Sequence, residues 1–229
     1  MFELKNVSKV YRKRQHEVTA FRVDDLTIDR GEYVAVVGPS GSGKTTLLSM
    51  LGGMLSPDSG TVKVEGVSLY ELSINDRAKL RRERIGFVFQ TFNLLPYLSA
   101  LDNVRVPLFL AKCEETAARE KAAALLDSLG LSQRLDHKPS ELSTGQQQRV
   151  ALARTLANEP RIILADEPTG NLDPDSREHI LSMFDQLVHS GKTIVMVTHD
   201  PSAAKRAHRQ LRLNDGQILA RESALKVVA

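Results

Sequence analysis

The chain has 229 residues, with 31 Lys or Arg against 28 Asp or Glu and a formal net charge of +3. Hydrophobic residues make up 41% and charged residues 26%, which is ordinary for a soluble globular protein and excludes a disordered chain. The small basic excess does not indicate a nucleic-acid-binding protein, because such a protein needs a clustered basic face. Since Cys113 is the single cysteine, an intrachain disulfide and a Cys-rich metal site are excluded, and a reducing compartment is expected.

The N-terminal residues carry charges at Glu3 and Lys5, where a secretion signal needs an apolar core. No apolar run approaches the roughly 20 residues that a membrane-spanning helix requires. We therefore expect a cytoplasmic chain that does not itself cross a membrane.

Strands alternate with helices in the first third of the chain. Apolar and β-branched runs predict strands at Phe2–Val7, Thr19–Ile28 and Tyr33–Val37. A glycine-rich turn at Gly38–Gly43 follows, and then a helix at Lys44–Leu51.

A turn at Ser56–Gly60 then leads into a strand at Thr61–Val64. Three further short apolar runs, each bounded by polar, Gly or Pro residues, are typical of buried parallel strands. They are Ile85–Phe89, Arg161–Ala165 and Thr193–Val197.

The middle of the chain has a different character. From about Leu94 to Lys138 it is rich in Ala, Leu, Glu and Lys, with a helix predicted over Glu114–Leu129 and ended by Gly130. We expect a helical insertion within an α/β core. The last stretch, Gln210–Ala229, predicts a hairpin that turns at Asn214-Asp-Gly.

The glycine-rich turn matches the phosphate-loop pattern G-x-x-x-x-G-K-[ST] between Gly38 and Thr45. Its glycines allow backbone N–H groups to point inward around phosphates. Lys44 is expected to reach the β- and γ-phosphates, and the Thr45 hydroxyl to bind Mg²⁺. The required context, a strand before and a helix after, is predicted as well.

Polar residues follow three other predicted strands. Gln90 follows the first, Asp166 and Glu167 the second, and His199 comes two residues after the third. Because ligands of open parallel sheets collect at the carboxyl ends of strands, we expect these groups to meet the phosphate loop. An amide, two carboxylates and an imidazole suit Mg²⁺-dependent phosphoryl transfer to water. Taken singly, Gln90 could be a surface amide, His199 a structural residue, and the acidic pair a solvated pair or helix cap.

The strings Leu142-Ser-Thr-Gly-Gln-Gln-Gln-Arg149 and Leu164-Ala-Asp-Glu-Pro-Thr-Gly-Asn-Leu-Asp173 stand in sequence after the phosphate loop. With them the whole chain resembles the ATP-binding cassette (ABC) family of ATPases. The resemblance implies a P-loop NTPase core with a mixed sheet, in which a parallel core is joined to an antiparallel N-terminal β part. It also implies a single ABC ATPase domain over 1–229, with a helical subdomain inserted at about 94–158.

The same resemblance implies the site. It assigns hydrolysis to Glu167, His199 and Gln90, and Mg²⁺ binding to Thr45, Gln90 and Asp166. The residues implied to bind ATP, some of them in the partner subunit of a homodimer, are Tyr11, Gly38, Ser40, Gly41, Ser42, Gly43, Lys44, Thr45, Thr46, Ser143, Gly145, Gln146 and Asp173. From the sequence alone, Tyr11 could equally be a packing aromatic, and Ser143 or Thr144 an ordinary N-cap of a helix over Gln146–Ala157.

One residue departs from the usual Leu-Ser-Gly-Gly-Gln signature, because Thr144 replaces the first glycine. A β-branched residue restricts the backbone and adds bulk near the phosphate. We expect activity to survive, with an altered affinity of the nucleotide sandwich or an altered rate of hydrolysis.

Four strings resemble the LolD/MacB/FtsE branch of the family, namely Phe89–Pro96, Leu101–Val104, Gln146–Arg154 and Asp166–Asp173. That branch implies an integral membrane permease as partner and a position on the inner face of the cell membrane. Large apolar residues after Gln90 could receive a partner helix or could belong to the core. These residues are Phe92, Leu94, Leu95, Tyr97 and Leu98.

Two other functions can be compared with that of a transport ATPase. An ATPase that gates a transmembrane signalling complex fits the same motifs. A GTPase does not, because Asp127–Gly130 ends a helical stretch and no Asn-Lys-x-Asp guanine motif is present. Basic residues of the stretch 77–84 predict a solvated helix face, with attraction to an anionic inner leaflet as the alternative.

Overall fold

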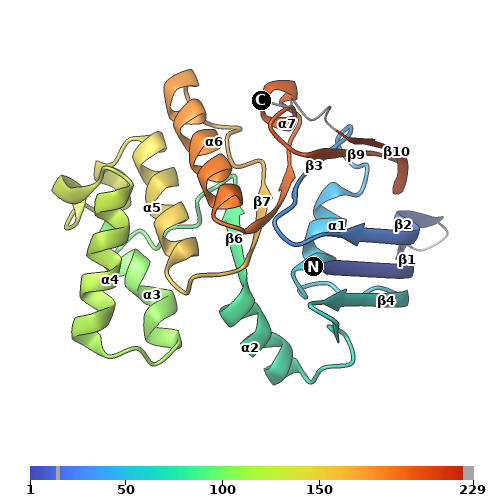
Figure 1. Cartoon of the computed structure of the whole chain (residues 1–229), viewed down its shortest axis with the longest axis horizontal. Helices are drawn as coiled ribbons and strands as arrows, with labels where there is room; N and C mark the ends of the chain where they lie inside the picture. Colours follow the sequence, from blue (N-terminus) through green and yellow to red (C-terminus); the bar gives the residue numbers. More distant parts are fainter. Residues whose placement is uncertain (14–15, 224–229) are drawn as a thin grey trace.

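A ten-stranded mixed sheet organises the chain (Figure 1). The computed structural model describes residues 1–13 and 16–223. The strands are β1 Phe2–Lys13, β2 His16–Ile28, β3 Tyr33–Val37, β4 Ser59–Val64, β5 Val67–Ser68, β6 Ile85–Phe89, β7 Ile162–Asp166, β8 Thr193–Val197, β9 Arg209–Asn214 and β10 Gln217–Ser223. The helices are α1 Lys44–Leu51, α2 Ile74–Arg84, α3 Ala100–Leu110, α4 Glu115–Ser128, α5 Thr144–Leu156, α6 Pro174–His189 and α7 Pro201–Ala204, with 3-10 turns at Ser132–Arg134 and Pro139–Glu141.

The sheet runs in the order β5-β4-β1-β2-β10-β9-β3-β8-β7-β6. Strands β9, β3, β8, β7 and β6 are parallel neighbours, whereas β1 pairs antiparallel with β2 and β4. The two parts meet where β10 pairs with β2, through one residue pair in the described part of the chain, Gln217 and Arg22. The predicted mixed sheet, with a parallel core and an antiparallel N-terminal part, is therefore confirmed.

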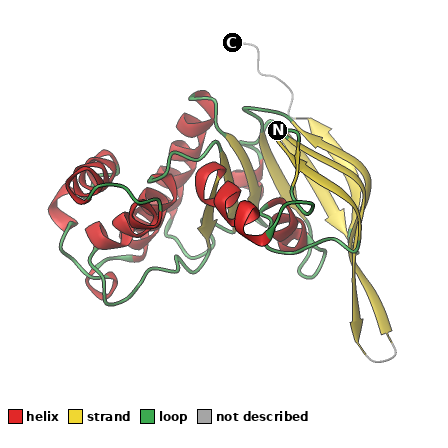
Figure 2. Cartoon of the chain, turned by 90° about the horizontal axis from the view of Figure 1, so that it is seen from below, coloured by secondary structure: helices red, strands yellow, loops and turns green. Residues whose placement is uncertain are grey.

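The first two strands are longer than predicted. They continue past Val7 and start before Thr19, forming a two-stranded ribbon that extends beyond the rest of the sheet (Figure 2). Ribbon residues such as Tyr11 and Val18 are exposed, so this part of the strands lacks the apolar pattern that marks a buried strand. Tyr11 consequently lies inside β1 and not after it.

Other predicted boundaries agree within a few residues. Helix α1 has the predicted bounds, and α4 ends before Gly130, whose φ is +70°. The C-terminal hairpin turns at Asp215 and Gly216, both with positive φ, and its strand is described to Ser223. Residues 224–229 of the predicted hairpin lie outside the described residues. The helical stretch expected from Leu94 is irregular at first and becomes helical at Ala100.

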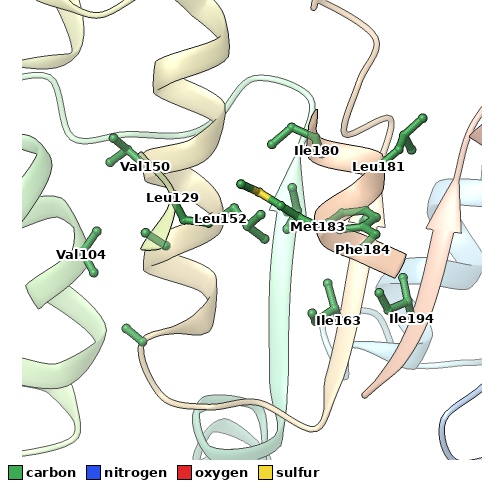
Figure 3. Packing of buried hydrophobic residues seen from close by; sticks show 14 of the residues in the cluster. Val104, Leu129, Val150, Leu152, Ile163, Ile180, Leu181, Met183, Phe184 and Ile194 are labelled. Carbon is green, nitrogen blue, oxygen red and sulfur yellow. The ribbon is translucent and has the colours of Figure 1, made fainter. Parts of the chain in front are cut away.

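Alternate side chains of the parallel strands face two different cores. On β3, Ala35 faces one cluster and Val34 the other. On β7, Ile163 and Ile162 divide in the same way, as the two-residue period of a strand requires. Helices α5, α6 and α7 cover the first face and α1 covers the second, while α3 and α4 pack against α5. Figure 3 shows residues of α6 packed over β7 and β8 on the first face.

Helices α3, α4 and α5 pack against one another at one end of the molecule (Figure 1). Helix α6 packs against α5 and β8 and was not predicted, although Asp173 caps its first turn and Pro174 begins it. Within residues 1–13 and 16–223, no helix is both long enough and apolar enough to cross a membrane.

A buried amide fixes the irregular segment that follows β6. The Asn103 side chain on α3 is 0% exposed. Its Oδ1 accepts from the Leu95 N–H at 2.8 Å, and its Nδ2 donates to the Leu95, Leu98 and Ser99 carbonyls. The segment between β6 and α3 has no regular secondary structure, and this one side chain binds several of its backbone groups.

We predict that Asn103→Ala lowers the free energy of unfolding by about 2–4 kcal/mol, because several buried backbone groups lose their partner. Chemical denaturation measures the change. Asn158→Ala is the matched control: Asn158 is half-buried and donates at 3.3 Å to two carbonyls, so a loss of about 1 kcal/mol or less is expected. Equal losses for the two variants would contradict the role given to Asn103.

Candidate nucleotide-binding and hydrolysis site

The loop between β3 and α1 forms a cradle of backbone groups. Lys44 Nζ donates to the carbonyls of Gly38 at 2.8 Å and Pro39 at 2.7 Å, so the lysine lies folded over the loop. No side chain caps the N-terminus of α1, and its N-cap residue Gly43 is left-handed with φ +99°. Uncapped N–H groups at the positive end of a helix dipole favour an anion.

The two outer glycines of the loop are fixed by close backbone neighbours. A Cβ atom at Gly43 would lie 2.1 Å from the Ala20 carbonyl oxygen of β2. A Cβ atom at Gly38 would lie 2.2 Å from the Leu213 carbonyl oxygen of β9. Both positions therefore require glycine for space, and Gly43 also requires it for its φ angle.

A pocket of about 520 Å³ lies over this loop. It brings together the groups predicted at the strand ends, namely Gln90, Asp166, Glu167 and His199. Its remaining lining is Tyr11, Val18, Ala20, Ser40, Gly41, Gly43, Lys44, Thr45, Thr46 and Val197. Ser42 is instead buried within the loop, and its Oγ has no hydrogen-bond partner among the described residues.

One wall of the pocket is the exposed ribbon. Tyr11, 49% exposed, lies directly across the strand pair from Val18. A ring and a branched aliphatic group, both open to solvent, form an apolar surface of the kind that a planar base can cover. Val18 was missed from the sequence, and only the cross-strand register with Tyr11 identifies it.

Asp166 ends β7 facing the phosphate loop. Its Oδ2 lies 3.4 Å from Thr45 Oγ1. Burial raises the pKa of Asp166 above its usual value, and the Thr45 hydroxyl acts in the opposite direction. A cation bound beside this partly buried carboxylate would favour its ionised form.

Glu167 is held in a strained conformation beside His199. Its φ is +48°, and its N–H donates to the Val197 carbonyl at 2.9 Å. The side-chain Oε2 lies 2.8 Å from Nδ1 of His199 and 3.4 Å from the His199 backbone N. Positive φ at a non-glycine residue costs of order 1–3 kcal/mol and is common at active sites. The turn aims the carboxylate into the pocket.

The signature residues lie elsewhere. Ser143 caps α5: its Oγ accepts from the Gln146 N–H at 3.2 Å while Gln146 Oε1 accepts from the Ser143 N–H at 3.0 Å. A Cβ at Gly145 would lie 2.2 Å from Ser176 Oγ, so this glycine is required by the approach of α6. Thr144 is exposed in the first turn of α5 and meets no such obstacle.

Asp173 caps α6 by accepting from the Ser176 N–H at 3.0 Å. Hydrogen bonds from the Ser176 backbone and side chain lower the pKa of the Asp173 carboxyl. Ser143, Gly145, Gln146 and Asp173 do not line the pocket over the phosphate loop. The predicted site residues thus divide between the pocket and two helix N-termini outside it.

Arg154 was also missed from the sequence. Its guanidinium donates to the Asn93 carbonyl at 2.6 Å and the Phe92 carbonyl at 2.7 Å, in the loop that follows Gln90. Burial lowers the pKa of Arg154. Arg154 thus anchors two backbone carbonyls of this loop. Phe92 and Asn93, whose carbonyls it binds, both have positive φ. The run from Gln146 to Arg154 carries the residue, but no spacing within it reveals the contact.

The phosphate loop, its strand-helix context and the polar strand ends define a P-loop nucleoside triphosphatase. Comparisons with known proteins narrow this class. The family model described as ABC transporter matches residues 21–170. The uncharacterized ABC transporter ATP-binding protein YvrO of Bacillus subtilis is 46% identical over 222 residues, covering 97% of both chains.

The macrolide export ATP-binding/permease protein MacB of Escherichia coli is 47% identical over 220 residues. These cover 96% of this chain but 34% of MacB, so the chain spans about a third of that relative. The dimeric post-hydrolysis structure of the ATP-binding cassette MJ0796, bound to ADP and Pi, is 41% identical with a TM-score of 0.92, covering 98% of this chain and 99% of that one.

The chain belongs to the ABC transporter family. It is the ATP-hydrolysing, nucleotide-binding subunit of such a transporter. The resemblance expected from the motifs, including the branch that contains MacB, is confirmed.

We predict that Gly43→Ala abolishes ATP binding and lowers stability by about 2–4 kcal/mol, because the new methyl group overlaps the Ala20 carbonyl and the φ is unfavourable. Calorimetric titration with ATP and thermal unfolding measure the two effects. Gly31→Ala is the control, since it has φ +70° but open space around the position. Its cost should stay near 1 kcal/mol, and nucleotide binding should be unchanged.

Proposed function

We propose that the pocket over the phosphate loop holds MgATP, with the triphosphate on the loop and the adenine against Tyr11 and Val18. The observation that carries this proposal is the cradle itself, an uncapped α1 N-terminus preceded by glycines that nothing larger can replace. On binding, Lys44 exchanges the Gly38 and Pro39 carbonyls for phosphate oxygens. Ser40, Gly41, Ser42 and Thr46 shape or line the same cradle.

Thr45, Asp166 and Gln90 fit a magnesium ion. A hydroxyl, a carboxylate and an amide are the hard oxygen ligands that Mg²⁺ takes, and it completes its shell with phosphate oxygens and water. Asp166 Oδ2 and Thr45 Oγ1 lie 3.4 Å apart, so both oxygens can face the same ion. When bound, the ion neutralises charge that develops on the phosphates during hydrolysis.

Glu167 acts as general base on the attacking water in this proposal, and His199 contacts the γ-phosphate. Glu167 Oε2 lies 2.8 Å from His199 Nδ1. Both groups line the pocket over the phosphate loop, where the carboxylate can reach a water and the imidazole a phosphate oxygen. The exposed Gln90 stands at the end of β6 where it can sense the same phosphate.

We propose further that two copies of the chain form a homodimer around two ATP molecules. Ser143, Gly145 and Gln146 lie at the N-terminus of α5, outside the pocket of their own subunit, and suit the γ-phosphate of the partner's nucleotide. Asp173 lies near the same surface. The dimeric structures of MJ0796 agree with such an arrangement. The chain would then be a single ABC domain over 1–229 with the helical subdomain at about 94–158.

A membrane permease is the proposed partner, held at the cytoplasmic face of the membrane. A groove of about 630 Å³ opens between the end of α2, edge strand β6, the loop after Gln90 and α3. Its apolar lining comprises Met54, Ala78, Ile85, Gly86, Phe87, Phe89, Leu95, Val106, Pro107, Leu110 and Pro160, and its polar lining Arg81, Arg82, Asn93, Arg154, Thr155 and Asn158.

The groove suits an amphipathic helix that carries a carboxylate, because its apolar lining adjoins the guanidinium groups of Arg81, Arg82 and Arg154. It shares Phe89 and Asn93 with the segment that contains Gln90, so an occupant would act directly on the ATP site. Of the apolar residues predicted to receive a partner, Leu95 lines the groove, whereas Phe92 and Leu94 pack against the core.

The transported substance is set by the permease. MacB is a macrolide exporter, and an export or lipoprotein-release complex is the proposed setting for this chain. A signalling complex is not favoured by the relatives found. The proposed permease is a separate polypeptide, as the resemblance to the LolD/MacB/FtsE branch implies.

We predict that Glu167→Gln lowers ATP turnover by roughly 10²–10⁴-fold, because the general base is lost while the shape of the pocket is kept. ATP affinity should remain, and an ATP-dependent dimer should accumulate in size-exclusion chromatography. Lys44→Ala is the contrasting variant and should lose ATP binding. Near-normal hydrolysis by Glu167→Gln would refute the base assignment, and unchanged affinity of Lys44→Ala would refute the cradle.

We predict that Leu110→Glu leaves the ATPase activity of the isolated subunit unchanged but prevents co-purification with the permease. Leu110 is 58% exposed and lines the groove. The control is Ile74→Glu, also an exposed apolar residue but outside the groove. Mild-detergent purification from native membranes with mass spectrometry gives the readout. If the Leu110→Glu variant still co-purifies with the permease, the groove is not the docking site. If no permease co-purifies with the unaltered protein, the proposal of a separate permease is wrong.

A further inference from the structure

Gln148, in the second turn of α5, is a completely buried amide with a single hydrogen bond. The side chain is 0% exposed, and its Nε2 donates to the Pro168 carbonyl at 2.5 Å. Its Oε1 has no hydrogen-bond partner among the described residues. An unpaired buried acceptor costs free energy, so a purely structural position would favour an apolar residue here.

The carbonyl that Gln148 binds belongs to the residue directly after Glu167. On the other side, the Glu167 N–H donates to the Val197 carbonyl of β8. The Glu167 carbonyl accepts from the Gly170 N–H at 3.1 Å. Proline fixes its own φ, so holding the Pro168 carbonyl limits the remaining rotation of this turn. The strained φ of Glu167 therefore lies between an anchor on the sheet and an anchor on α5.

The same face of α5 meets the segment after Glu167 more than once. Gly145, three residues before Gln148, is in contact with Ser176 of α6. Arg149 faces Asp173, whose carboxylate raises the arginine's pKa against the lowering effect of burial. The helix that begins at Ser143 thus holds the segment from Pro168 to Asp173 within its own subunit.

We propose that Gln148 is a positioning residue for hydrolysis, which fixes the Glu167 turn relative to α5 through the Pro168 carbonyl. It does not touch the substrate. A shift of α5 would move Pro168, and Pro168 would reorient the Glu167 carboxylate. The proposal rests on the proposed function only in taking Glu167 as the general base.

The test compares two glutamines of the same helix. Gln148→Met keeps the volume but removes the donor, and is expected to lower kcat by roughly 10-fold or more, since small misplacements of catalytic groups have effects of this size. The KM for ATP should change by less than about 2-fold, because binding groups are untouched. Gln147→Met is the matched control: its Nε2 donates to the Leu142 carbonyl at 3.0 Å, away from Glu167, so kcat should be unchanged.

A second measurement separates positioning from general damage. In a Glu167→Gln background, Gln148→Met should cause no further loss of the residual rate, because it acts through Glu167, and the ATP-dependent dimer should still form. A further loss, a lost dimer, or equal effects of the two methionine variants would overturn the proposal. Gln148→Leu replaces Gln148→Met if the latter does not fold.

The outcome also distinguishes this inference from the proposed function. If Glu167→Gln hydrolyses ATP normally, the base assignment is wrong whatever Gln148 does. If Glu167→Gln is inactive and Gln148→Met has the kcat of the unaltered protein, only the positioning role is wrong.

Discussion

The close approach of two glycines to neighbouring backbone is the constraint on which the site depends. Gly38 lies against a carbonyl of β9 and Gly43 against a carbonyl of β2. These contacts wedge the phosphate loop between the parallel and antiparallel parts of the sheet. Only a residue without a side chain fits at each of these two points, and glycine there lets the loop turn its N–H groups toward the pocket. The strand ends that carry Gln90, Asp166, Glu167 and His199 are arranged around it.

Helix α5 ties the remaining functional loops together. Thr155 donates to the Phe87 carbonyl of β6 at 2.6 Å, and Arg154 binds the loop after Gln90. Gln148 binds the turn after Glu167, and Ser143 begins the same helix. One helix therefore contacts the groove proposed for the permease, the turn that carries Glu167 and the surface proposed for the second subunit. Rigid elements of this kind can carry mechanical coupling, because a helix moves as a unit.

Sequence patterns predicted the parallel core and the phosphate loop well, because buried strands and the spacing of glycines and lysine leave strong local signals. The helix at Glu114–Leu129 was predicted for the same reason, since its cap and its stop are local. The ribbon around Tyr11 was not, because both its faces are exposed and the apolar alternation is lost. Contacts such as Arg154 with Phe92, or Gln148 with Pro168, join residues 62 and 20 positions apart and leave no periodic trace. These long-range contacts need the fold itself.

The seam between the two parts of the sheet has a mechanical consequence. Among the described residues, the ladder between β10 and β2 consists of one pair, Gln217 and Arg22, and residues from both parts of the sheet share one apolar cluster. Apolar packing is non-directional, and small rotations across it break few directional bonds. The short ladder beside the phosphate loop leaves few directional bonds to resist a tilt between the two parts. Because the Ala20 carbonyl of β2 lies against Gly43, the strand that places Val18 opposite Tyr11 also contacts the phosphate loop, and a tilt of the ribbon would be transmitted to that loop.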